Sequence, residues 1–229
     1  MTMVLRPQID LDNDRWEELL EKYKLAPVMS AARIKALWRR IRTCSSPVIW
    51  YDLQDRQTVA VAATLGPGID RLQEEWCSHS QLLDVYAADC ISMEALQSLY
   101  RVVEKELQQQ GLYICHYIFT QTGTGTDEKA EGSGDPDKAV MAGFKSETGQ
   151  LLEMLSADIH LTAEGMMQPL KSVVYRGILS ENEEERCGTV CGDCSRRDCP
   201  FSRSLHMDNY RETGVLKYSY GYQRIFGQK

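Results

Sequence analysis

The stretch PVIWYDLQDRQTVAVAATLG, residues 47–66, decides which class of fold the chain can form. Two runs rich in β-branched and aromatic residues, Val48–Tyr51 and Val59–Thr64, flank a polar turn, which is the pattern of a β-hairpin. The two strands of a hairpin are antiparallel neighbours in one sheet. We therefore expect a sheet that contains antiparallel pairs next to the helices of the chain.

Helical patterns lie on both sides of this hairpin. Apolar residues recur at helical spacing before it, where Asp14 and Ser30 are candidate N-caps. After it, Pro67 suits the first turn of a helix and Gly111 suits a helix stop. The spacing predicts helices over 14–24, 30–42, 66–76, 80–90, 92–110 and 146–155.

Further strands are expected in the second half of the chain. They are predicted over 112–119, 157–162 and 171–179, and the alternating tail 214–227 predicts one more. Residues 120–137 are rich in Gly, Thr and Asp and predict a long loop. Strict alternation of strand and helix is absent, so the sequence predicts an α+β fold with a largely antiparallel sheet.

Charge and hydropathy exclude some classes of function. The net charge is −7. Nucleic-acid binding needs a basic surface, so the acidic composition of the chain argues against that function. The basic residues clustered within 33–42 are interpreted as a solvated helix face. No apolar run is long enough for a membrane span and no secretory signal is visible. We therefore expect a cytoplasmic protein with no membrane partner, whose thiols are reduced.

Four of the eight cysteines are crowded into CGTVCGDCSRRDCPFSR, residues 187–203. Cys187, Cys191, Cys194 and Cys199 have the spacing C-x3-C-x2-C-x4-C. The central pair can chelate one ion, and further thiolates could complete a zinc site or an iron–sulfur cluster. The alternative is a thiol-bearing loop whose cysteines have no common role or pair reversibly. The other cysteines, at 44, 77, 90 and 115, are expected to be small buried apolar residues.

No catalytic constellation is visible in the residues themselves. The four histidines have no metal-binding spacing, and there is no nucleophile elbow, P-loop or dinucleotide-binding motif. The residues alone therefore predict an α+β domain with a thiolate metal site as one candidate, and no enzyme class.

Two stretches resemble a known family. They are VAVAATLGPGIDRLQEEWCSHSQLLDVYAADCISMEALQSLYRVVEKELQQQG, residues 59–111, and IHLTAEGMMQPLKSVVYRGIL, residues 159–179, which CGDCSRRDCPFSR follows. The segments ATLG-x2-ID-x-L and LT-x3-MM-x-P-x-KS, with Asp89 between them, resemble the activation domain of vitamin B12-dependent methionine synthase in its standalone bacterial form. The resemblance covers roughly residues 45–205.

The resemblance implies a C-shaped single domain with a twisted antiparallel sheet flanked by helices. It divides the chain into an N-terminal helical segment (1–45) packed on the domain, an activation-like domain (46–205) and a C-terminal strand or tail (206–229). Such a module assists reductive remethylation of cobalamin on a partner methyltransferase or corrinoid protein. It uses S-adenosylmethionine and an electron from a flavodoxin-like or ferredoxin donor, and it is not catalytic alone.

The matching motifs supply the candidate cofactor-binding residues, which are Asp89, Glu94, Met166, Met167, Lys171 and Ser172. Each also has a plain structural interpretation, because methionines fill cores and acidic residues cap or pair within helices. The usual Arg-x-x-x-Gly-Tyr motif for S-adenosylmethionine is absent after the strand 112–119. The alternatives are a degenerate S-adenosylmethionine-binding module and a zinc-stabilised interaction module without activity of its own.

Overall fold

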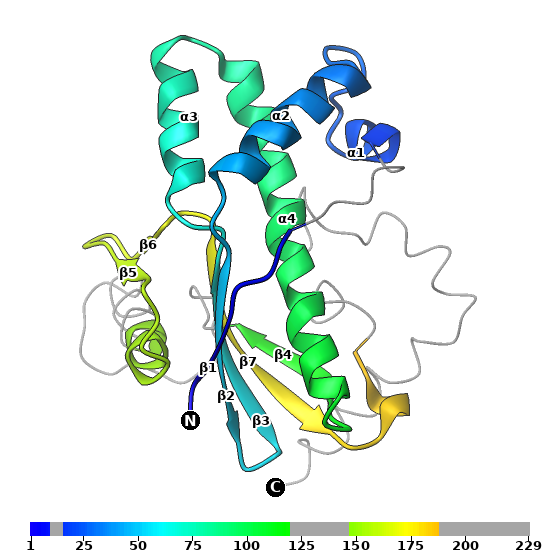
Figure 1. Cartoon of the computed structure of the whole chain (residues 1–229), viewed down its shortest axis with the longest axis vertical. Helices are drawn as coiled ribbons and strands as arrows, with labels where there is room; N and C mark the ends of the chain where they lie inside the picture. The colour runs from blue at the N-terminus through cyan, green and yellow to red at the C-terminus, as the bar shows by residue number, and fades with distance from the viewer. Residues whose placement is uncertain (10–15, 120–146, 188–229) are drawn as a thin grey trace, which may run out of the picture.

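A computed structural model describes residues 1–9, 16–119 and 147–187. Its centre is a five-stranded antiparallel sheet with the order β1-β2-β3-β7-β4 (Figure 1). The strands are β1 (Met3–Leu5), β2 (Val48–Gln54), β3 (Thr58–Thr64), β7 (Ser172–Ser180) and β4 (Tyr113–Phe119). The predicted α+β class with an antiparallel sheet is confirmed.

The predicted hairpin is formed by β2 and β3, which pair over seven residues from Val48↔Thr64 to Gln54↔Thr58. Asp55 and Arg56 in its turn have positive φ angles of 51° and 55°, which is the left-handed conformation that tight hairpin turns require. The strand β7 comes from far along the chain and pairs with β3 over another seven residues. The hairpin strand β3 is therefore one neighbour of β7, and β4 is the other.

The helices follow the predicted periodicity, with one correction. They are α1 (Trp16–Lys22), α2 (Ala31–Cys44), α3 (Gly68–Ser78) and α4 (Leu82–Gln108), and residues 147–154 are also helical. The predicted break between helices 80–90 and 92–110 is wrong, because α4 is continuous through Ile91 and Ser92. Ser92 is fully buried inside α4 instead of capping a new helix, so the apolar packing outweighs the capping tendency of serine.

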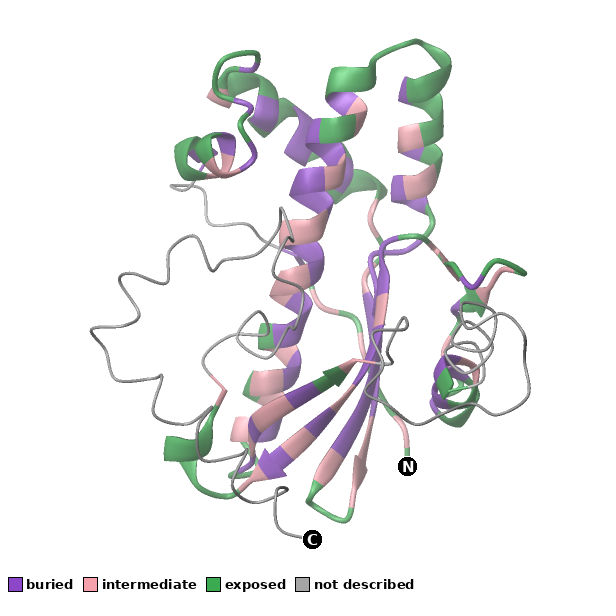
Figure 2. Ribbon diagram, turned by 180° about the vertical axis from the view of Figure 1, so that it is seen from behind, coloured by how far each residue is buried: buried purple, intermediate pink, exposed green. Residues whose placement is uncertain are grey.

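Each face of the sheet packs on different helices (Figure 2). One face carries Ile49, Val61 and Tyr175 and shares the main core with α1–α4. The other face carries Trp50 and Val174, which pack with the apolar side of the helical residues 147–154. Alternate strand residues point to opposite faces, so both sides of β2, β3 and β7 are buried at their centres.

The predicted strand 157–162 is mostly wrong. Only His160–Leu161 (β5) is a strand, and it pairs with Met167–Gln168 (β6), which was expected to be a connection. These two short strands form a separate sheet beside the main one (Figure 1). Gly165 lies between them with a φ of 85°, a conformation that glycine adopts without steric cost. The turn therefore folds the chain back before β7 begins.

Several predicted features lie outside the described residues, namely the Asp14 cap, the loop 120–137 and the tail strand 214–227. The proposed division at residue 45 stays a prediction. Buried residues on both sides of that division, such as Trp38 and Val61, belong to the same core cluster. The β1 strand also pairs residues 3–5 with β2.

Candidate functional site

Three of the predicted cofactor-binding residues meet where β3 leads into α3 and where β7 begins. Lys171 Nζ forms an ion pair with the carboxylate of Asp89 on α4. The Lys171 side chain is only 11% exposed, whereas that of Asp89 is 39% exposed. Gln73 Nε2 on α3 donates to the same Asp89 oxygen at 3.4 Å. The junction thus presents one side of a carboxylate to solvent while its other side is held by a buried ammonium group.

Asp70 holds the same junction from α3. Its Oδ2 accepts a hydrogen bond of 2.9 Å from the backbone N–H of Leu170, and its Oδ1 is buried with no hydrogen-bond partner among the described residues. Burial raises the pKa of Asp70, although the Leu170 N–H and the charge of Lys171 oppose that shift. Asp70 is therefore a strained acceptor with spare hydrogen-bonding capacity inside the junction.

The hydroxyl groups of Ser172 and Thr64 lie on the buried side of the junction. Ser172 Oγ lies 2.8 Å from Thr64 Oγ1 and 2.6 Å from the carbonyl oxygen of Pro169. The Leu65 N–H donates to the Lys171 carbonyl at 2.9 Å, and the Gly66 N–H donates to Thr64 Oγ1 at 3.0 Å. Ser172 is buried by these contacts. It therefore fixes the start of β7 instead of facing a ligand.

Glu94 lies away from this junction. It is on α4, but it pairs with Lys22 Nζ of α1 and accepts a hydrogen bond of 2.5 Å from the hydroxyl of Tyr23. Both charged side chains are at most 20% exposed. This arrangement attaches α1 to α4, so the structure gives Glu94 a packing role and does not join it to Asp89.

The two methionines are also apart from the junction. Met166 is 53% exposed in the turn between β5 and β6. Met167 is half-buried on β6 and packs against the smaller core cluster under the helical residues 147–154. The shared motif therefore places Lys171 and Ser172 at the junction and leaves the methionines on the adjoining short hairpin.

Cys187 is the one predicted metal ligand within the described residues, since Cys191, Cys194 and Cys199 lie outside them. Its backbone N–H donates to the Ile114 carbonyl of β4 at 2.8 Å, and its side chain packs on the main core. Residues 1–9, 16–119 and 147–187 contain no group of three or more His, Cys, Asp or Glu side chains able to hold a metal ion. The cysteine segment thus begins at the edge of β4.

A polar and aromatic cluster that sequence reasoning missed lies beside Cys187. Glu104 on α4 accepts from the hydroxyl of Tyr117 at 2.5 Å and from Arg186 at 2.9 Å. Tyr175 stacks on Tyr100 with ring centroids 5.0 Å apart, and within the part of the chain that the structure describes its buried hydroxyl has no hydrogen-bond partner. Burial raises the pKa of Tyr117 and of Tyr175 far above the ordinary value. Both hydroxyls therefore stay protonated.

The scattered cysteines divide into two groups. Cys90 is fully buried, and burial raises its pKa to about 11, so its thiol stays protonated at neutral pH. The prediction that all four are buried is wrong for Cys44 and Cys77, which are exposed at the ends of α2 and α3. A terminal turn leaves part of the helix surface uncovered, which apolar spacing alone does not reveal.

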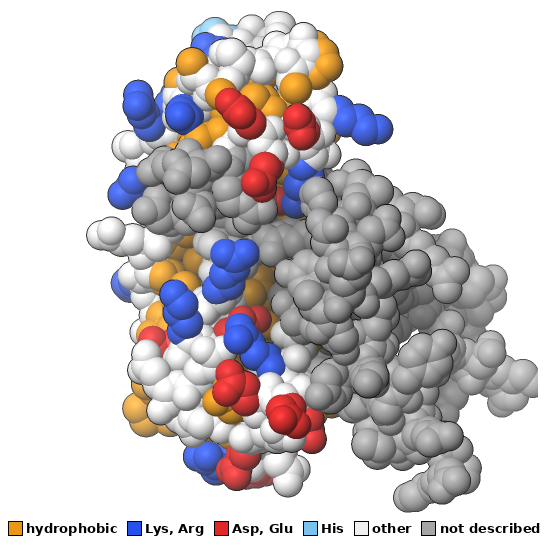
Figure 3. All heavy atoms as spheres, turned by 90° about the vertical axis from the view of Figure 1, so that its right-hand side faces the viewer, with side chains coloured by type: hydrophobic (Ala, Val, Ile, Leu, Met, Phe, Trp, Pro, Cys, Tyr) orange, Lys and Arg blue, Asp and Glu red, His pale blue; other side chains and the backbone are white. Residues whose placement is uncertain are grey.

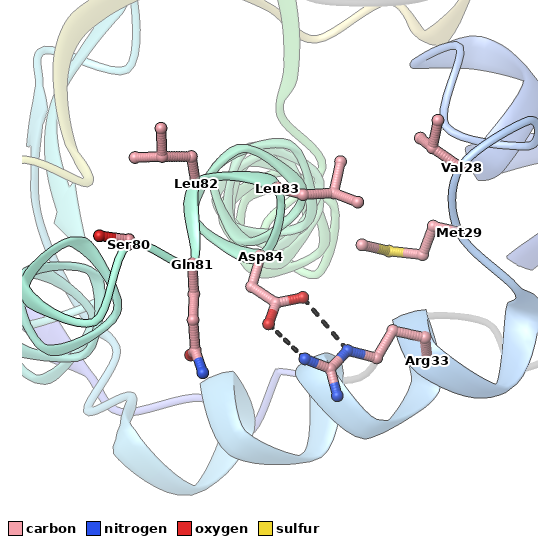
Figure 4. A pocket seen from close by; sticks show the side chains of 8 residues that line it. All are labelled: Val28, Met29, Arg33, Ser80, Gln81, Leu82, Leu83 and Asp84. Atoms are coloured by element: carbon pink, nitrogen blue, oxygen red, sulfur yellow. Dashed lines mark hydrogen bonds and ion pairs between the residues drawn. The ribbon is translucent and has the colours of Figure 1, made fainter.

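Two open hollows lie on other parts of the surface. One, of about 350 Å³, is lined by Val28 and Met29 and by residues 80–84, and the Arg33–Asp84 ion pair crosses its floor (Figure 4). The other, of about 510 Å³, lies along residues 149–161, from the helical residues 147–154 to β5. Within the described ranges, the predicted cofactor-binding residues line neither hollow. The candidate site is therefore the Asp89–Lys171 junction itself.

Comparison with known proteins does not assign the chain to a family. No protein-family model matches the chain, and no curated protein matches it significantly. In the described part of the chain, no helix combines the length and the apolar character that crossing a membrane demands.

Proposed function

We propose that this protein is an accessory module that docks on a corrinoid protein or cobalamin-dependent methyltransferase and assists reductive reactivation of its cofactor. We place it in the cytoplasm, with a flavodoxin-like or ferredoxin electron donor. The proposal rests on the resemblance of residues 59–111 and 159–179 to methionine synthase activation domains, and on the absence of a catalytic constellation in the sequence.

One structural observation supports it best. The two resembling stretches are separated in sequence, yet they are the two halves of one unit. β3 pairs with β7 over seven residues, and the Asp89–Lys171 ion pair and the Asp70–Leu170 hydrogen bond join α3 and α4 to the start of β7. A half-exposed carboxylate at this junction offers a polar contact point for a partner surface.

The described residues of the junction do not fit S-adenosylmethionine. The ammonium group of Lys171 is already paired with Asp89, and the carboxylate of Asp70 at the same junction would repel the α-carboxylate of the ligand. The α-carboxylate of the ligand would lack the bidentate partner that such groups prefer. We therefore derive no step from this ligand.

The cysteine segment is the proposed redox element. A cluster held by Cys187, Cys191, Cys194 and Cys199 would supply one-electron chemistry when bound, whereas zinc at the same thiolates would make the segment structural. Iron, zinc and sulfide analysis of anaerobically purified protein separates these two proposals. Metal-free protein with four titratable free thiols in this segment would rule out both.

The proposed function is tested with the cobalamin-dependent methyltransferase encoded in the same genome, prepared with cob(II)alamin. We expect the protein to bind it saturably and, in the presence of a reductant, to speed the loss of the cob(II)alamin absorption spectrum. The substitution K171M should weaken binding about tenfold, because it removes the partner that orients Asp89.

The matched control is K105M, which changes an exposed lysine on α4 away from the junction. It should leave binding and reactivation unchanged. If the wild-type protein neither binds the methyltransferase in any cobalt state nor changes its reactivation rate, the proposed function is wrong. If the wild-type protein binds and the substitutions K171M and K105M weaken binding equally, the junction is not part of the docking surface.

A further inference from the structure

The outer surface of α2 has an unusual charge. The helix contains five basic residues and no acidic residue within Ala31–Cys44, although the chain as a whole has a net charge of −7. A solvated helix usually mixes both signs, because like charges three or four residues apart repel each other. The basic side chains of this helix therefore repel one another, with no acidic residue on the same helix to offset the repulsion.

The five basic side chains fall on two flanks of the helix. On one flank, Arg33 pairs with Asp84 of α4 (Figure 4), and Arg40 binds Glu75 of α3 at 3.1 Å. Arg40 also lies over the ring of Trp76 at 4.8 Å. These two arginines are thus used internally, because they attach α2 to the neighbouring helices.

The other flank carries Lys35, Arg39 and Arg42, which we call the basic stripe. They are spaced four and then three residues apart, so they lie in one row along the helix. All three are exposed, and their charged groups form no ion pair within the described residues, although the backbone carbonyls of Arg39 and Arg42 accept hydrogen bonds from Thr43 and Ser45. The helix dipole favours Arg42 in the last turn, but Lys35 and Arg39 lie outside the terminal turns, where that effect has fallen off. The stripe is therefore not explained by the stability of the helix.

The surface next to the stripe allows a partner to approach closely. Between the two flanks lie Ala32, Ala36 and Thr43, which are exposed and short. In Figure 1, α2 lies in front of α4, and no helix or strand of the described residues lies in front of α2. Figure 3 shows by contrast that acidic and basic side chains are interspersed with apolar ones on another side of the molecule.

We propose that the basic stripe docks on an acidic face of a protein partner. Three cations in one row, beside a ridge of small residues, match a row of carboxylates on a helix or strand of that partner. The net charge of −7 opposes approach to nucleic acid or to an anionic membrane, which favours a local protein contact over a polyanion. This inference does not depend on the proposed function, since it needs no corrinoid.

The test uses the full chain and a fluorescent alanine-rich helical peptide with glutamates spaced four and three residues apart. We expect binding that weakens at least about tenfold between ~50 and ~300 mM salt, because exposed charge pairs are screened. The triple variant K35Q/R39Q/R42Q should weaken binding at low salt about tenfold or more. The same peptide with glutamine in place of glutamate should not bind.

The matched control is R71Q/R101Q/K105Q, which removes the same three charges from exposed positions on α3 and α4. It should bind the peptide like the wild-type protein, and circular dichroism should show both variants folded. Equal weakening by the two triple variants would mean that net charge, not the stripe, attracts the peptide.

Four further outcomes would overturn the proposal. Stripe-dependent binding to single-stranded DNA with comparable affinity would indicate a nucleic-acid surface. Stripe-dependent binding to phosphatidylserine vesicles would indicate a membrane surface. A dimer of the wild-type chain in sedimentation that the stripe variant abolishes would indicate a second copy as the occupant. No peptide binding at low salt would leave α2 as a merely solvated face.

Discussion

Two lysine–carboxylate pairs attach α4 to distant parts of the chain, and they differ in how far water reaches them. At Lys22–Glu94 both side chains are at most 20% exposed, and the hydroxyl of Tyr23 binds the same carboxylate. At Lys171–Asp89 the lysine is buried but the carboxylate is 39% exposed. The first pair is closed, whereas the second has one open side.

The difference separates packing from candidate function. A closed pair must keep both partners, because an unpaired charge in that position cannot be solvated well. An open carboxylate can be rehydrated when its lysine is lost, and it can also meet a partner from outside. Asp89 and Glu94 are both acidic residues on the same helix, and only their surroundings distinguish them.

The largest expected effect is that of Glu94→Ala. It leaves Lys22 and the Tyr23 hydroxyl without their shared acceptor. We expect the free energy of unfolding to fall by about 2 to 3 kcal/mol, toward the lower end of the cost of breaking a buried pair. The midpoint of urea denaturation measures it.

Glu74→Ala is the control for this change, because Glu74 is exposed on α3. It should alter the free energy of unfolding by less than about 0.5 kcal/mol, as is usual for surface substitutions. If Glu94→Ala costs no more than this control, the pair at α1 is not closed and the comparison fails.

A smaller effect is expected for Lys171→Met. The apolar part of the lysine is retained in shape, and Asp89 keeps Gln73 and water as partners. We expect a loss of about 1 kcal/mol in the free energy of unfolding, near the upper range for partly exposed pairs. The urea midpoint again measures this.

Lys171→Arg, which keeps the charge, should cost less than Lys171→Met if the ion pair is what matters. A cost for Lys171→Met equal to that of Glu94→Ala would show that the junction is as closed as the α1 contact. The structural basis for treating Asp89 as a docking residue would then be lost.

The sequence predicted much of this framework from short-range patterns. The hairpin β2–β3 and the N-cap of α2 follow from local composition, and Ser30 Oγ does accept from the Arg33 N–H. The position of β7 between β3 and β4 could not be predicted in the same way. It depends on which distant strand completes the sheet, and periodicity contains no information about strand neighbours.

The candidate site was predictable in part. The motif match placed Asp89, Lys171 and Ser172 in one group, and the structure brings them to one junction. Glu94, Met166 and Met167 were included on the same grounds and lie elsewhere. The cluster around Glu104 and Tyr117 was missed because its members are far apart in sequence and each looks like an ordinary helix or strand residue.

The smallest expected effect is that of Asp70→Asn, and it depends on pH. Burial raises the pKa of Asp70 above its ordinary value of 3.8 in the folded protein. The folded state then holds the proton more tightly than the unfolded state, so ionised Asp70 destabilises the fold as pH rises above 3.8. Asparagine has no charge to bury and can still accept from the Leu170 N–H.

We therefore expect Asp70→Asn to be more stable than the wild-type protein at neutral pH, by less than about 1 kcal/mol because the side chain is partly solvated. The advantage should shrink as pH falls through the raised pKa of the folded state and vanish below 3.8, where Asp70 becomes protonated in both states. Thermal denaturation at several pH values measures it. Asp55→Asn, in the exposed hairpin turn, should show no such trend. If Asp70→Asn is instead destabilised more as pH rises, the ionised carboxylate is stabilising. The junction would then be electrostatically as satisfied as the closed Lys22–Glu94 pair.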